Sequence, residues 1–192
     1  MEPVSRLKDD HPLRNFFTVL AEKNFHEQLG WPDYRVIKYV ADLLADFYHV
    51  DHVYPLHDGQ GKRQSQVSDL LLEAETGATL SERAAHRHVG DFTLFMMGLF
   101  PEHLARLKTH MIGVVSGDAL LDYVKVGKRS YRIVSELPHR DGEGEDWEGV
   151  AELFRKLSEH FELCVAGVGY IRLDLRRRRD MPFPERWRER WL

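Results

Sequence analysis

The segment from His86 to His103, HRHVGDFTLFMMGLFPEH, constrains the fold more than any other part of the chain. Its apolar residues between Val89 and Phe100 cover every side of a helix, and Asp91 is the only charged residue among them. Because a helix that is apolar all round is buried all round, we expect this segment to form a buried central helix. An unpaired carboxylate is costly to bury, so Asp91 is expected to have a partner.

Helical periodicity extends over most of the chain. Apolar residues recur at helical spacing in five further segments, residues 13–29, 34–50, 67–75, 118–137 and 147–175. Ser81 suits the start of the central helix, and Pro101 suits the first turn of another one. Residues 164–171 are the only stretch in which a short strand competes. We therefore predict an all-α protein, a single-domain bundle of about seven helices around the buried central helix.

Two of the predicted helices share a feature, since Gly90 and Gly98 lie in the central segment and Gly127 lies in the 118–137 segment. Glycine inside a helix costs roughly 1 kcal/mol relative to alanine, and the usual compensation is a close approach of two backbones. We therefore predict that these two helices cross at their glycines. Three donors are then candidates to pair with Asp91: Tyr131, Arg129 and a backbone amide.

Three sequence elements resemble a family of uncharacterised bacterial all-helical proteins. These elements are GDxxLFxxGxFPExL over residues 90–104, YxxxGxxSY over residues 123–131 and FxxLxxxFxxxV over residues 154–165. The resemblance implies a bacterial cytoplasmic protein with a helical fold. It implies no activity, ligand or catalytic residue, and the arginine-rich end of this chain has no counterpart in it.

Eleven histidines raise the question of a metal centre. The candidate ligands are His49, His52, His86, His88 and His103, with carboxylates from Asp46, Asp91 and Glu102. Such a set suits iron, manganese or zinc. The only Glu-x-x-His sequence, residues 136–139, contains a proline that interrupts its helix. The simpler interpretation, which we favour, involves no cofactor. It places His49 and His52 at the surface or at helix ends, and His86 and His88 on a solvated turn.

A second candidate site is a small-ligand site among the helices. Its candidate residues are Asp91, Glu102, Tyr123 and Tyr131, because the two tyrosines flank the predicted glycine crossing. Asp91 is more simply interpreted as a structural hydrogen-bond anchor. Glu102 is more simply interpreted as a negative charge near the positive end of a helix dipole.

Motifs for nucleophilic catalysis and phosphate binding are incomplete. Residues 113–117 miss the GxSxG register by one residue, and residues 59–62 lack the first glycine and the Ser/Thr of a P-loop. Cys164 lies among apolar neighbours that raise the pKa of a thiol, and a single cysteine forms no internal disulfide. We find no transmembrane stretch and no secretory signal. These features favour a cytoplasmic location.

Residues 176–192, RRRRDMPFPERWRERWL, are expected to form a basic aromatic C-terminal arm after a helical domain over residues 1–175. Such an arm can bind nucleic acid or an anionic membrane surface. We favour the alternative that its aromatic side chains pack on the domain or on a second subunit. The sequence therefore favours a non-enzymatic regulatory or protein-interaction module that forms homodimers. The alternative is an enzyme or sensor that binds metal or a small ligand through Asp91 and the nearby histidines.

Overall fold

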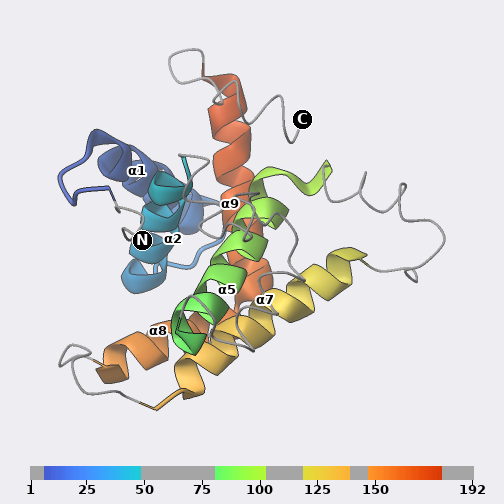
Figure 1. Ribbon diagram of the computed structural model, residues 1–192. Helices are drawn as coiled ribbons and strands as arrows, with labels where there is room; N and C mark the ends of the chain where they lie inside the picture. Colours follow the sequence, from blue (N-terminus) through green and yellow to red (C-terminus); the bar gives the residue numbers. More distant parts are fainter. Residues whose placement is uncertain (1–6, 49–80, 103–118, 139–146, 179–192) are drawn as a thin grey trace, which may run out of the picture.

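The structure is a computed structural model, and it describes residues 7–48, 81–102, 119–138 and 147–178. Every regular element in these ranges is a helix, which confirms the all-α prediction (Figure 1). The helices are α1 (Pro12–Glu27), α2 (Tyr34–Phe47), α5 (Glu82–Leu99), α7 (Ala119–Glu136), α8 (Trp147–Glu159) and α9 (Phe161–Arg177). The helix expected over residues 67–75 lies outside the described residues. The total of about seven helices therefore stays a prediction.

Local capping explains where the first two helices begin and end. Pro12 occupies the first turn of α1, where its missing N–H costs nothing, and Gly30 follows the helix with a positive φ of 60°. Asp33 caps α2, because its side chain accepts hydrogen bonds from the backbone N–H groups of Arg35 and Val36. These caps lie where the sequence predicts helix boundaries.

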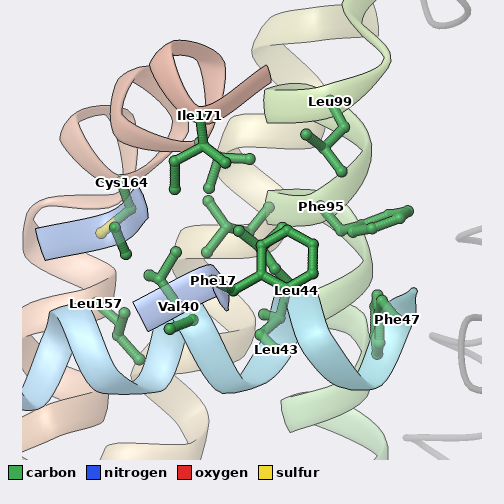
Figure 2. Packing of buried hydrophobic residues seen from close by; sticks show 14 of the residues in the cluster. Phe17, Val40, Leu43, Leu44, Phe47, Phe95, Leu99, Leu157, Cys164 and Ile171 are labelled. Atoms are coloured by element: carbon green, nitrogen blue, oxygen red, sulfur yellow. The ribbon is translucent and has the colours of Figure 1, made fainter. Parts of the chain in front are cut away.

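Helix α5 begins at the predicted position and is buried along its second half. The Ser81 side chain caps it by accepting a hydrogen bond from the Ala84 N–H. Residues 89–96 are all buried, Asp91 included. Figure 2 shows Phe95 and Leu99 of this helix directed toward core side chains, and the Phe95 ring lies 5.1 Å from the Phe47 ring of α2. The expectation of burial on every side is therefore confirmed for residues 89–96, whereas Met97 is half-buried.

The prediction of one long helix over residues 147–175 is wrong. The helix is interrupted at His160, whose φ of −109° and ψ of 30° are not helical. Helices α8 and α9 therefore point in different directions (Figure 1). Helix α8 packs mainly on α7, whereas α9 packs mainly on α5 and α1. One straight helix cannot bury apolar side chains against both groups of neighbours. Residues 164–171, where a strand competed, lie within α9.

Gly90 and Gly127 lie at the predicted crossing of α5 and α7. The Tyr131 ring of α7 fills the space beside Gly90, where a Cβ atom would lie 2.5 Å from it. At Gly127 a Cβ atom would lie 2.3 Å from the Phe161 ring of α9 and 2.6 Å from the Thr93 Oγ1 atom of α5. Gly98 differs from the prediction because its neighbour is Val168 of α9, so a third helix uses this position.

Arg14 is a buried cation that joins α1 to α2 and to the residues preceding α1. Its guanidinium lies 2.8 Å from an Asp42 carboxylate oxygen and 2.9 Å from an Asp46 one. It also donates a 2.7 Å hydrogen bond to the Leu7 carbonyl oxygen. These contacts need several donors in fixed directions, which the planar guanidinium supplies.

Replacing Arg14 with lysine is expected to lower the free energy of unfolding by about 1 kcal/mol, because an ammonium group cannot reproduce the forked set of hydrogen bonds. Urea denaturation followed by circular dichroism measures this change. The matched control is Arg155→Lys, since Arg155 makes comparable contacts with Glu152 and Glu159 at the exposed surface. We expect no measurable change for that variant. Equal losses in the two variants would contradict a special role for Arg14.

Candidate functional site

The carboxylate of Asp91 is the acceptor that joins three helices. Its Oδ1 atom accepts a 2.5 Å hydrogen bond from the hydroxyl of Tyr39 on α2 and a 2.8 Å hydrogen bond from the hydroxyl of Tyr131 on α7. Of the three donors considered from the sequence, Tyr131 is therefore confirmed. The crossing at Gly90 explains the geometry, because a side chain there would occupy the space of the Tyr131 ring.

Arg87 supplies the positive charge beside this carboxylate. Its Nε atom lies 3.6 Å from the second oxygen of Asp91, one helical turn further along α5, and donates a 3.1 Å hydrogen bond to the Tyr39 hydroxyl. The guanidinium also lies over the rings of Tyr39 and Phe154, 5.2 and 5.8 Å from their centroids. We call Tyr39, Arg87, Asp91 and Tyr131 the Asp91 cluster.

Aromatic packing fixes the two tyrosines of the cluster. Their rings meet edge to face with centroids 6.3 Å apart, and the Phe154 ring lies within 5.6 Å of both centroids. The Phe161 ring lies 5.9 Å from Tyr131 on another side. Edge-to-face pairs at these separations are favourable beyond the area that they bury. The hydroxyl groups are therefore held in position by rigid rings.

Burial raises the pKa of both Tyr39 and Tyr131 well above the ordinary value of 10.0, and the Asp91 carboxylate adds to both shifts. Arg87 opposes the shift at Tyr39 without reversing it. The two phenols consequently stay protonated and act as hydrogen-bond donors at neutral pH. In the cluster both tyrosine hydroxyls donate and the Asp91 carboxylate accepts.

The raised pKa values predict a loss of stability at alkaline pH. Above pH 10 the two phenols ionise in the unfolded chain but keep their protons in the folded one, so the folded state binds more protons. The free energy of unfolding should therefore fall as the pH rises above about 10. Phenolate absorbance and circular dichroism, recorded together, measure ionisation and unfolding. If all seven tyrosines ionised while the fold stayed intact, the prediction would be wrong.

The predicted small-ligand set is only partly brought together. Asp91 and Tyr131 are in contact, whereas Glu102 follows the end of α5 and lies 2.8 Å from Arg172 of α9. Burial acts to raise the pKa of Glu102, but its own backbone N–H, Arg172 and Arg176 together lower it, so the carboxylate is held as an ion-pair partner. Tyr123 is half-buried against the apolar core, two helical turns before Tyr131. The four residues therefore do not form one site.

The metal hypothesis gains no support from the described histidines. His86 and His88 lie within α5, so the expectation of a solvated turn is wrong: His86 is buried, and the His88 ring packs 5.8 Å from the Phe47 ring. Asp46 is engaged by Arg14. No three potential ligating side chains gather within the described ranges, and the candidates His49, His52 and His103 lie outside them.

Sequence reasoning missed Tyr39 and Arg87. The spacing of Arg87 and Asp91, four residues apart on one helix, is the signal that could have identified the arginine. Tyr39 stands next to the apolar positions of α2 and carries no motif, so only the packing of α2 against α5 reveals it. Cys164 agrees with its sequence-based interpretation, because burial raises the pKa of its thiol and makes it unreactive.

Comparison with known protein families, with curated proteins and with solved structures gives no match for this chain. Within the ranges that the structure describes, no helix combines the length and the apolar character needed to cross a lipid bilayer.

Proposed function

We propose that this chain is a non-enzymatic regulatory or protein-interaction module of the bacterial cytoplasm that acts as a homodimer. One observation supports this proposal most directly. Asp91, the acidic group with the strongest sequence signal for chemistry, uses its carboxylate to bind side chains from α2, α5 and α7. A carboxylate engaged in this way stabilises the fold, so function through the protein surface is what the geometry supports best.

The proposal extends to the architecture. We infer a single helical domain over residues 1–175, with about seven helices arranged around α5. The burial of residues 89–96 supports this arrangement, as do the contacts of α5 with α2, α7 and α9. A close-packed core keeps the helices, and the residues on their outer faces, in fixed positions, which suits a protein-interaction module.

Sedimentation velocity from nanomolar to micromolar concentration tests the homodimer. We expect a species of twice the 22.5 kDa chain mass that dissociates on dilution. A monomer at every concentration would contradict the homodimer. Elemental analysis of protein purified without an affinity tag tests the non-enzymatic module against a metalloenzyme. Stoichiometric iron, manganese or zinc, with a lower melting temperature after its removal, would overturn the proposal.

A further inference from the structure

Helices α1 and α9 lie side by side and run antiparallel. Three contacts join them in order: Gly167 with Phe25, Asp174 with Lys23, and Arg178 with Phe16. The Asp174 carboxylate lies 3.1 Å from the Lys23 ammonium group, and the Arg178 guanidinium lies 5.2 Å from the centre of the Phe16 ring. The end of α9 therefore lies beside the beginning of α1.

Exposed apolar side chains lie on both helices of this pair. Val19 on α1 is 62% exposed, and Tyr170 and Leu173 on α9 are 37% and 42% exposed. Tyr170 and Leu173 are three residues apart and share one side of α9. Val19 follows Phe16 by three residues and precedes Lys23 by four, so it shares the side of α1 on which those two residues reach α9. We call Val19, Tyr170 and Leu173 the α1–α9 face.

The chain leaves α9 at the edge of the α1–α9 face. Arg178, the first residue after the helix, is extended, with φ −84° and ψ 134°. Its side chain already lies over Phe16 of α1 in the same chain. The segment that follows therefore starts from a contact with α1 rather than from free solvent.

The next fourteen residues, 179–192, have the composition to cover such a face. Five large apolar side chains lie among them, Met181, Phe183, Trp187, Trp191 and Leu192. A segment of this length spans up to about 46 Å when extended, whereas α1 is about 24 Å long. Trp187 and Trp191 are four residues apart, so a helical turn there places both on one side.

We propose that residues 179–192 dock on the α1–α9 face of their own chain, with Trp187 and Trp191 covering Val19, Tyr170 and Leu173. The intramolecular arrangement is favoured because Arg178 already contacts Phe16 in the same chain, and because the short connection gives the arm a high effective concentration at this face. Docking removes apolar surface from water. This inference goes beyond the proposed function and does not depend on it.

Fluorine NMR of full-length protein labelled with 5-fluorotryptophan tests the docking, with the four tryptophan signals assigned from single tryptophan-to-phenylalanine variants. We expect the Trp187 and Trp191 signals to lie away from the position of the free amino acid. They should move to that position in the Val19→Asp, Leu173→Asp double variant. Tyr34→Asp is the matched control, because Tyr34 is 64% exposed on α2, and it should leave both signals unchanged. All three substitutions are at exposed positions, so the fold is retained.

Two results would overturn the inference. The first is that the Trp187 and Trp191 signals of the unmodified protein lie at the position of the free amino acid, or that they do not move in the double variant. The second is that both signals move when the protein is diluted until light scattering on the same samples shows a monomer. That result would mean that the arm docks on a second copy of the chain. Signals that stay in place in the monomer support docking within one chain. If the protein proves to be a monomer at every concentration, the test of docking within one chain is still valid.

Discussion

Replacing Asp91 with alanine is expected to lower the free energy of unfolding by about 2 to 4 kcal/mol, because the change leaves a half-buried cation and two tyrosine hydroxyls without the carboxylate that they share. The hydroxyls belong to Tyr39 and Tyr131, and the cation is Arg87. For a chain of this size the loss corresponds to a fall in melting temperature of roughly 10 °C. Urea denaturation and thermal scans followed by circular dichroism measure both quantities.

Tyr131→Phe is the matched control for the alanine variant. It keeps the ring that fills the space beside Gly90 and removes only one of the donors to Asp91. We expect a loss of about 1 kcal/mol, the usual contribution of one hydrogen bond. A loss below about 1 kcal/mol for Asp91→Ala itself would show that the cluster does not anchor the fold.

Replacing Gly98 with alanine is expected to lower the free energy of unfolding by about 2 kcal/mol. A Cβ atom there would lie 2.3 Å from Cγ1 and 2.5 Å from Cβ of Val168, so α5 or α9 must move. Overpacking of this kind costs about 1 to 3 kcal/mol or more. Alanine recovers roughly 1 kcal/mol through its better helix propensity, which reduces the net effect. Chemical denaturation gives the value directly.

Gly169→Ala tests the same substitution on α9 without the clash. Nothing lies within 4 Å of a Cβ atom at Gly169, so only the propensity gain remains, and we expect an increase in stability of up to about 1 kcal/mol. Combining Gly98→Ala with Val168→Ala removes the obstructing methyl groups and should cost less than the sum of the two single changes. The same sign of effect at Gly98 and Gly169 would contradict the packing explanation.

The local elements of the fold were predictable from the sequence. The predicted start of α2 is the observed one, and that of α1 differs by one residue. Periodicity and capping act within a few residues, so they can be recognised without knowledge of the partners. The α8–α9 break at His160 carries neither a glycine nor a proline, and the periodic pattern runs across it. The break arises because residues before His160 bury their apolar side chains mainly against α7, whereas residues after it bury theirs mainly against α5 and α1.

For the candidate site, the amino-acid pattern alone established that Asp91 enters the core on an apolar helix and needs a partner there. Tyr131 could be named because glycines mark the crossing of α5 and α7. The hydrogen bond from Tyr39 to Asp91 and the contact of Gly98 with Val168 were decided only by the tertiary structure, since they depend on how α2 and α9 pack on α5. The physical reason is that periodicity defines which face of a helix is buried, whereas the neighbour on that face depends on burying all the apolar faces at once.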